Sequence, residues 1–292
     1  MPSGRAPRRA TLGAVMKAAE LDRIRSIAVQ IAEGAGAVLS RRYQKLAPGE
    51  IEHKGRTDLV TAADRESEAH VIARLKEHFA SHGIVAEESA PQPGKGQLCW
   101  YIDPLDGTTN FAHGFHAFAV SIALYEGPEP LVAVVHAPAL GETFHAVQGG
   151  GAFVGEKRLS VSTVDTLLQS LLVTGFACVR DQLKANNLSN FNRLMGLTQG
   201  VRRVGSAALD MAYVAAGRFE AFWELCLAPW DVAAGALLIK EAGGEVTDFH
   251  GGRDWLLGRH IIATNRRIHR LLSEQLDPID AAEIAAVCGP KS

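Results

Sequence analysis

Two stretches near the N-terminus place apolar residues at every third or fourth position. This spacing puts them on one face of an α-helix, so we predict amphipathic helices over residues 18–43 and 64–79. His82 and Gly83 follow the second stretch, where a glycine C-cap is expected. The apolar positions of the two stretches are Leu21, Ile24, Ile27, Ile31, Val38, Ala69, Ile72, Leu75 and Phe79.

Between residues 83 and 161, short apolar runs replace the helical spacing. Their length, their β-branched content and the Gly or Pro residues around them are typical of strands. Tight glycine turns in the second part of this region favour a meander of short strands. The predicted strands cover residues 83–86, 98–102, 118–125, 131–136, 143–147, 152–154 and 159–161.

The second half of the chain alternates strand and helix patterns, which predicts a partly parallel sheet covered by helices. We expect an α+β half over residues 18–162 and an α/β half over residues 163–292. No linker rich in Pro, Gly or Ser separates them, so they should pack as one globular unit with the chemistry between them. The predicted elements are strands at 171–176, 201–204, 221–224 and 245–248, and helices at 190–197, 207–216 and 230–242.

Residues 1–17 contain four basic and no acidic residues. This composition resembles a transit peptide but lacks the apolar core of a secretory signal. A flexible N-terminal tail, produced by a start codon upstream of Met16, is the simpler interpretation.

Composition narrows the class of protein. The 292 residues are 47% hydrophobic and 21% charged with a net charge of -2, which indicates a soluble globular protein and argues against nucleic acid as the main ligand. No run approaches the roughly 18 apolar residues of a membrane span. The cysteines form no C-x-x-C pair, so we expect reduced thiols and a cytoplasmic location. The four cysteines are Cys99, Cys178, Cys226 and Cys288.

A pair of carboxylates follows one of the predicted strands, in the run I-D-P-L-D-G-T-T-N-F at 102–111. Pro104 restricts the backbone between Asp103 and Asp106 and keeps the pair out of a helix. Carboxylates this close resist simultaneous ionisation unless a cation lies between them, and Mg²⁺ prefers such oxygen ligands. The D-x-x-D spacing alone is a weak signal, since residues 277–280 repeat it in D-P-I-D with no glycine or threonine after it.

The residues after the first pair strengthen the metal interpretation, because Gly107 and Thr108 can begin a helical turn whose N–H groups point at an anion. Further carboxylates stand at comparable positions. Glu87 ends the strand 83–86, while Asp231 and Asp64 each lie at the start of a predicted helix. Each of the last two has an alternative reading, Asp231 as a charge that stabilises its helix terminus and Asp64 as an N-cap.

Four motifs together resemble the inositol monophosphatase family, in its bacterial form. They are D-L-V-T-A-A-D at 58–64, A-E-E-S at 86–89, W-Y-I-D-P-L-D-G-T-T-N-F at 100–111 and P-W-D-V-A-A-G-A-L-L-I-K-E-A-G-G at 229–244. The likeness extends over about residues 18–270. It implies a layered αβαβα sandwich of the sugar phosphatase type, Mg²⁺ dependence, inhibition by Li⁺ and a homodimer.

The resemblance also implies roles for the carboxylates. Glu87, Asp103 and the carbonyl of Leu105 would hold one Mg²⁺, and Asp103, Asp106 and Asp231 a second. A third, weaker ion would depend on Glu87, which makes two to three ions in all. The cations would remove the repulsion of an otherwise untenable charge cluster.

For catalysis the resemblance implies attack by a metal-activated water on the phosphate. Glu87, Thr108 and Asp64 would orient this water and help to deprotonate it, with Thr108 as a hydrogen-bond relay to Asp64. The N–H groups of Gly107 and Thr108 would bind the phosphate oxygens. No Ser or Cys nucleophile is required.

Substrate recognition is expected from G-S-A-A-L-D at 205–210 and F-W-E at 222–224. The resemblance places Ser206, Ala207 and Glu224 near the ring hydroxyls of the substrate. Glu224 could accept hydrogen bonds from two hydroxyls. Ser206 could donate one, although an N-cap role explains this residue equally well.

Several neighbouring residues have two interpretations. Lys54 resembles a loop lysine that supports the weaker metal site, or is a solvated loop residue. Thr109 and Asn110 are expected to tie down the turn, and Glu88 is expected to point away by strand alternation. His113 and His116 are expected to be solvated or packed rather than to bind Mg²⁺.

The predicted function is therefore Mg²⁺-dependent hydrolysis of phosphate monoesters, with myo-inositol monophosphate as the preferred substrate. The alternatives within the same superfamily are phosphatases for fructose 1,6-bisphosphate, 3′-phosphoadenosine 5′-phosphate or histidinol phosphate. From another class, the chain could be a macromolecular interaction protein that keeps a phosphatase fold. All the expected metal carboxylates are present, which favours an enzyme.

Overall fold

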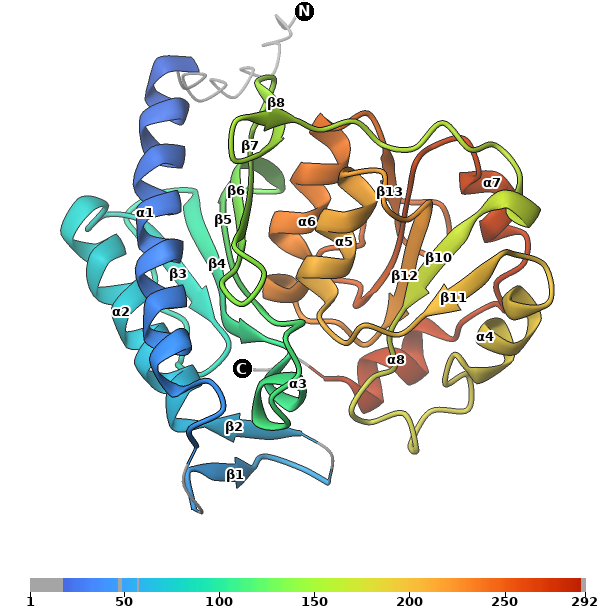
Figure 1. The fold of residues 1–292 in the computed structure, drawn as a ribbon, viewed down its shortest axis with the longest axis horizontal. Coiled ribbons are helices and arrows are strands. Elements are labelled where there is room, and N and C mark those ends of the chain that lie inside the picture. The colour runs from blue at the N-terminus through green and yellow to red at the C-terminus, as the bar shows by residue number, and fades with distance from the viewer. Residues whose placement is uncertain (1–17, 47–48, 57, 290–292) are drawn as a thin grey trace, which may run out of the picture.

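Helices and sheets alternate in layers across the molecule (Figure 1). The computed structural model describes residues 18–46, 49–56 and 58–289. In order, the layers are the pair α1 and α2, a seven-stranded sheet, the pair α5 and α6, a five-stranded sheet, and an outer layer with α4 and α7. This is the αβαβα sandwich that the sequence predicts. The expected N-terminal tail, residues 1–17, lies outside the described residues.

The first layer consists of α1 (Ala18–Arg42) and α2 (Ala62–His78), as the apolar spacing predicts. The details at the ends of α2 differ from the prediction. Thr61 is the N-cap, with Asp64 in the third helical position of a capping box, and the helix ends at Phe79 rather than at Gly83. A hairpin of β1 (Ile51–His53) and β2 (Leu59–Thr61), which the periodicity did not reveal, precedes α2.

The seven-stranded sheet runs in chain order. Its first pair is parallel and all the others are antiparallel. The predicted strand at 159–161 is wrong, because the last short strand is Lys157–Arg158 and the chain then leaves the sheet, with Val161 donating to the carbonyl of Ala242 at 3.1 Å. The strands are β3 (Gly83–Ala86), β4 (Leu98–Asp106), β5 (Ala119–Glu126), β6 (Glu129–Ala137), β7 (Glu142–Val147), β8 (Gly151–Val154) and β9 (Lys157–Arg158).

The five-stranded sheet has the order β11-β10-β12-β14-β13. β10 pairs in parallel with β11 and β12, whereas β14 is antiparallel to both of its neighbours, so the sheet is partly parallel as predicted. β14 was not predicted. The strands are β10 (Leu171–Thr174), β11 (Gly200–Arg202), β12 (Ala221–Leu225), β13 (Glu245–Thr247) and β14 (His260–Thr264).

The remaining helices cover the second sheet or lie between the sheets. The short α3 (Thr108–Ala112) follows β4 directly, and α8 (Ala281–Val287) closes the described chain. The others are the 3₁₀ helix Leu167–Gln169, α4 (Leu188–Met195), α5 (Ala207–Ala215), α6 (Pro229–Glu241) and α7 (His269–Ser273). No helix among the described residues is long and apolar enough to span a bilayer.

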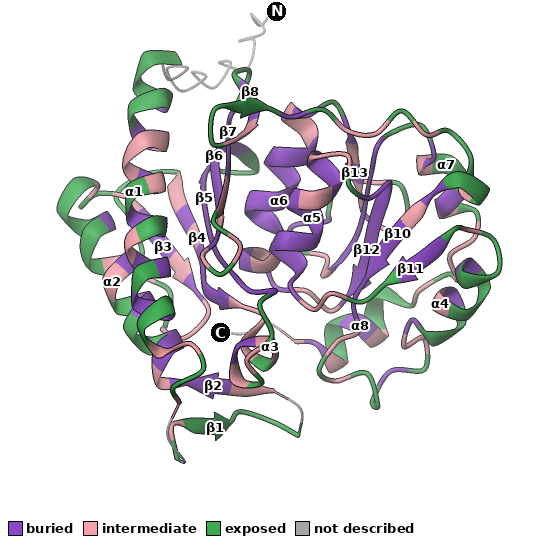
Figure 2. Ribbon diagram, in the orientation of Figure 1, coloured by how far each residue is buried: buried purple, intermediate pink, exposed green. Residues whose placement is uncertain are grey.

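The main core lies around α5 and α6, which are buried along most of their length (Figure 2). Both helices are apolar on nearly all faces, as expected for elements covered on two sides. The same cluster contains Ala123 and Phe144 from the first sheet and Phe222 and Ile261 from the second. Residues from both halves of the chain therefore share one core. A division at residue 162 stays a prediction.

Candidate active site

A cavity of about 420 Å³ lies where the two halves meet. Strands β3, β4 and β12 end at it, and helices α3, α5 and α6 begin at it. Helix N-termini carry partial positive charge and free N–H groups, which suit the binding of anions. The acidic residues that line the cavity are Asp58, Glu87, Asp103, Asp106, Asp210, Glu224 and Asp231.

Both carboxylates of the D-x-x-D pair reach the cavity because β4 is irregular between them. Asp103 is opposite Ser121 and Asp106 is opposite Ala119, with a register shift in between. In a regular strand, residues three apart point to opposite faces. The carboxylate of Asp103, which is only 2% exposed, also accepts from the N–H of Leu105 at 3.0 Å.

Asp106 joins the first sheet to the start of α5. Its Oδ2 accepts from the Ser206 hydroxyl and from the N–H of Ala208, both at 2.7 Å. Burial raises the pKa of Asp106 to about 6, although these hydrogen bonds oppose the shift. Burial also raises the pKa of Asp103 well above its usual range, with further contributions from Glu87, Asp106 and Asp231. A cation in the cavity would relieve this repulsion.

Asp231 and Asp64 both serve their helices and also belong to the site. Asp231, in the first turn of α6, accepts from the N–H of Ala228 at 2.6 Å and lines the cavity. Asp64 accepts from the N–H and hydroxyl of Thr61 at 2.8 and 2.6 Å, and from the Thr108 hydroxyl at 3.0 Å. The structural and functional interpretations of these residues are therefore compatible.

The donor set around the cavity fits a hard divalent cation. Glu87, Asp103, Asp106 and Asp231 supply carboxylate oxygens, which Mg²⁺ prefers. Burial and repulsion from the other three carboxylates both disfavour the ionised form of Asp103, which a bound cation would stabilise. Within residues 18–46, 49–56 and 58–289, no three His, Cys, Asp or Glu side chains already have the spacing of a metal centre. Ion binding would therefore draw the carboxylates closer.

Lys54 contacts two neighbouring glutamates rather than the solvent alone. Its Nζ donates to Glu87 Oε1 at 3.3 Å and also to Glu88 Oε1. Glu87 lines the cavity, whereas Glu88 is not among the described residues that line it, which agrees with the expectation that Glu88 points away. Burial raises the pKa of Glu88 to about 7, and the hydrogen bond from Lys54 opposes this rise.

The turn after β4 is held in a conformation that glycine favours. Gly107 has φ +95°, and a Cβ there would lie 2.9 Å from the carbonyl oxygen of Ala117. Gly107, Thr108 and Thr109 all line the cavity. Asn110 Nδ2 donates to the carbonyls of Ala117 and Val204 at 2.6 and 2.9 Å, so this side chain ties the turn to the second half of the chain.

The three residues predicted to recognise the substrate, Ser206, Ala207 and Glu224, also line the cavity. Glu224 packs directly against Gly175, where a Cβ would come within 2.0 Å of Glu224 Oε2. Ser206 caps α5 by accepting from the N–H of Leu209 at 3.4 Å. Because its single hydroxyl hydrogen is donated to Asp106, Ser206 can only accept a hydrogen bond from a substrate.

Sequence reasoning missed three residues of this wall, Asp210, Arg203 and Arg259. Asp210 is 1% exposed, and its Oδ1 has no hydrogen-bond partner in the described part of the chain. Its position four residues after Ser206 places both on one face of α5. That spacing was the available signal. His113 and His116 are not among the described residues that line the cavity.

The titration of Glu224 leads to a stability prediction. Burial raises the pKa of Glu224 from 4.5 to about 8, with Asp231 and Asp106 adding to the rise and Arg203 opposing it. The folded state favours the protonated form of Glu224. The stability that this proton contributes to the folded protein is therefore fully present below pH 4.5 and is lost as the pH rises towards 8. In EDTA at pH 8, the free energy of unfolding of Glu224→Gln should exceed that of wild type by on the order of 2 kcal/mol.

Urea unfolding of both proteins at pH 5 and pH 8 would measure this difference. The advantage of Glu224→Gln should be much smaller at pH 5, where the wild-type carboxyl is protonated when folded. An equal difference at the two pH values would contradict the elevated pKa.

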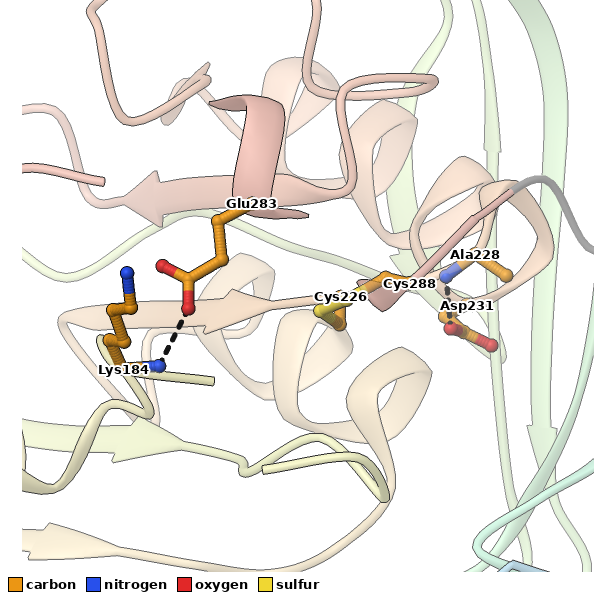
Figure 3. Close-up of a disulfide and its surroundings, with 6 residues drawn as sticks. All are labelled: Lys184, Cys226, Ala228, Asp231, Glu283 and Cys288. Atoms are coloured by element: carbon orange, nitrogen blue, oxygen red, sulfur yellow. Dashed lines mark hydrogen bonds between the residues drawn. A yellow bond between two sulfur atoms is a disulfide. The ribbon is translucent and has the colours of Figure 1, made fainter. Parts of the chain in front are cut away.

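The cysteines differ from the expectation of four thiols. A disulfide joins Cys226 to Cys288, whose Cα atoms are 5.5 Å apart (Figure 3). The two bonded residues are 62 positions apart in the chain. Sequence spacing could not reveal the contact, because it depends on where α8 packs.

Comparison with known proteins agrees with this geometry. A model described as the inositol monophosphatase family matches residues 20–281. The protein named Nus factor SuhB from Pseudomonas aeruginosa is 43% identical over 258 residues, covering 87% of this chain and 95% of the relative. An inositol-1-monophosphatase from Mesorhizobium japonicum is 42% identical over 248 residues, covering 85% and 93%. The solved structure of inositol monophosphatase from Anabaena (Nostoc) sp. has a TM-score of 0.81 at 42% identity, covering 89% and 98%.

Proposed function

Because the chain belongs to the inositol monophosphatase family and is a phosphoric monoester hydrolase, we propose that its substrate is myo-inositol monophosphate and its cofactor Mg²⁺. The observation that carries the proposal is the single cavity at which four acidic side chains, an anion-binding turn and the Glu224 wall meet. A phosphate and a polyol can then occupy adjacent parts of one site.

We assign the metal ligands to Glu87, Asp103, the carbonyl of Leu105, Asp106 and Asp231. All five residues line the cavity. When bound there, Mg²⁺ would neutralise phosphate charge and lower the pKa of a coordinated water. Two to three ions suit the number of carboxylates, with the weakest near Glu87 and Lys54.

The pair Thr108 and Asp64 would position the attacking water. The Thr108 hydroxyl lies 3.0 Å from Asp64 Oδ1 and 3.1 Å from the carbonyl oxygen of Leu105. When its hydrogen is donated to Asp64, the oxygen lone pairs are free to accept from a water in the cavity. Burial raises the pKa of Asp64, which makes it a better proton acceptor. Glu87 would orient the same water directly.

The N–H groups of Gly107 and Thr108 would bind the phosphate oxygens. The positive φ of Gly107 directs this turn, and the contacts of Asn110 hold it against the second half of the chain. Donors fixed in this way need no reorganisation when charge develops on the phosphate.

The alcohol part of the substrate would bind between Glu224, Asp210, Ser206 and Ala207. Glu224 and Asp210 are buried carboxyls, and burial is the main cause of the raised pKa of each. The unpartnered Oδ1 of Asp210 needs a hydrogen-bond partner, which a substrate hydroxyl would supply. Two such groups favour a polyol over a simple alcohol.

Changing this wall should affect binding of the polyol more than the chemical step. We expect Glu224→Gln to raise KM for inositol 1-phosphate by about tenfold and to leave turnover of a small generic ester nearly unchanged. Asp210→Asn is expected to behave in the same way. Steady-state kinetics on both esters would measure the effect, and an equal loss on both would remove Glu224 from the recognition role.

Phosphate release from a panel of monoesters tests the proposed function itself. The panel contains inositol 1-phosphate, fructose 1,6-bisphosphate, 3′-phosphoadenosine 5′-phosphate and histidinol phosphate, each with Mg²⁺ and with EDTA. Preference for inositol 1-phosphate with Mg²⁺ alone supports the proposal. Preference for another member would keep the metal assignment and overturn the substrate.

Family members with high identity are named Nus factors, which keeps the interaction role as the alternative. The test above separates the two, because absence of turnover on every ester would favour that role. A homodimer, Li⁺ inhibition and a cytoplasmic location stay predictions, and light scattering would measure the first.

A further inference from the structure

We propose that the C-terminal segment, residues 281–289, is a wall of the substrate cavity that limits the size of the alcohol group, and that the Cys226–Cys288 disulfide holds this wall in place. The proposal rests on the phosphatase function proposed above. It adds a specificity element and a means of changing it with a dithiol reductant.

The segment lies beyond the part of the chain that the family accounts for. The family match ends at residue 281, where α8 begins. Val287, Cys288 and Gly289 nevertheless line the same cavity as Asp103 and Glu224. A segment outside the family match therefore helps to line the cavity that the family motifs build.

The disulfide connects this segment to the recognition wall. Cys226 follows β12 directly and is two residues after Glu224, and it lines the cavity together with Cys288. Figure 3 shows the bond with Asp231 and its Ala228 hydrogen bond drawn alongside. The disulfide thus lies at the cavity, and Cys226 is close in the chain to a residue proposed to bind the polyol.

Besides the disulfide, α8 takes part in a small hydrophobic cluster. Ile284 is its one buried residue and packs near Leu183 and Leu225. The carboxylate of Glu283 accepts from the N–H of Lys184 at 2.7 Å (Figure 3). Isolated helices as short as this one are marginal in water, so the covalent bond should contribute much of the attachment.

Reduction would release the wall by ordinary thiol–disulfide exchange. A thiolate of the added dithiol attacks one sulfur of the bond, which breaks and leaves a mixed disulfide and one protein thiolate. The second thiol of the reagent then closes its own disulfide. The protein gains two electrons and two protons and has thiols at Cys226 and Cys288.

The first test compares a compact with a bulky substrate. Inositol 1-phosphate and 3′-phosphoadenosine 5′-phosphate are assayed on the oxidised full-length protein, on the same protein with dithiothreitol, and on Cys288→Ser. We expect reduction and Cys288→Ser each to raise kcat/KM for the bulky ester by about tenfold, with less than a twofold change for the compact one. Cys99→Ser is the matched control and should respond to dithiothreitol as wild type does.

A variant that ends at residue 280 should match reduced wild type, since it lacks the wall altogether. Dithiothreitol should have no effect on Cys288→Ser. The proposal would be overturned if the ratio of kcat/KM for the two esters were unchanged in the reduced protein and in both variants. Four titratable thiols in the denatured, oxidised protein would also overturn it.

A second measurement does not need turnover, so it separates failure of this inference from failure of the proposed function. Hydrogen exchange followed by mass spectrometry should show that amides of residues 281–289 lose protection on reduction, while those of α6 keep theirs. If protection of the segment were unchanged, the claim that the disulfide holds it in place would be wrong even in an active enzyme. If protection were lost but no ester were hydrolysed, the disulfide would still be shown to hold the segment, and the proposed substrate would be wrong.

Discussion

Asp103→Asn is expected to reduce kcat for phosphate release by about 10³-fold or more, because it removes a carboxylate assigned to both Mg²⁺ ions. The structure explains why the fold should survive. The asparagine oxygen can still accept from the N–H of Leu105, which lies 3.0 Å from Asp103 Oδ1. Phosphate release over a range of Mg²⁺ concentrations would measure the effect.

The same variant should be at least as stable as wild type in EDTA at neutral pH. Burial and the neighbouring carboxylates Glu87, Asp106 and Asp231 raise the pKa of Asp103 well above its usual range. The ion-free wild type therefore loses stability as the pH rises and Asp103 ionises. Asparagine cannot ionise, so the variant does not have this loss. Thermal unfolding with and without Mg²⁺ should show stabilisation by the ion in wild type and much less in the variant.

Asp165→Asn is a suitable control, since Asp165 is exposed and does not line the cavity. It should keep wild-type activity and the wild-type response to Mg²⁺. Full activity of Asp103→Asn at the Mg²⁺ concentration that saturates wild type would refute the metal assignment.

Asp64→Asn and Thr108→Val should each lower kcat by about 10²-fold with little change in KM. Thr108→Val removes the hydroxyl that donates to Asp64 at 3.0 Å, and Asp64→Asn removes the carboxylate charge that would take up the proton. Because the two groups act as one unit, the double variant should be little slower than either single variant. Single-turnover kinetics of the three variants would measure the coupling.

The helix cap needs its own control, since Asp64 also accepts from Thr61. Thr61→Val disturbs the cap without touching Thr108, so it should lower stability by about 1 kcal/mol. Its kcat should stay near the wild-type value. If Thr61→Val were as slow as Asp64→Asn, misplacement of α2 rather than a relay would explain the loss. The relay would also be contradicted if the loss of kcat in the double variant equalled the product of the two single losses.

The position of the candidate site could be predicted because its motifs are local, while its chemistry stays a proposal. The run at 102–111 contains three of the five proposed ligands and the phosphate turn within ten residues, and each remaining motif follows a strand or begins a helix. Strand ends and helix starts meet at one edge in layered α/β folds. Together with the family resemblance, this order of elements predicted that Glu87, Asp106 and Asp231 would converge, and all three line the cavity.

The wall around the alcohol group was predicted less well, because its residues depend on long-range packing. Asp210 follows an apolar helix start, and its burial with an unpartnered Oδ1, which only the structure shows, marks it more clearly than its spacing from Ser206. The contact of Glu88 with Lys54 was also missed, because Lys54 lies in a loop 34 positions earlier.

By itself, the sequence determined the types of most elements, the layered class and the set of carboxylates, since periodicity and motif spacing are properties of neighbouring residues. The tertiary structure decided the rest. It showed the register shift that turns Asp103 and Asp106 to the same side, the pairing of β14 with β12, and the disulfide that brings Cys288 to the cavity. Each depends on contacts between distant segments, which packing selects and local pattern does not encode.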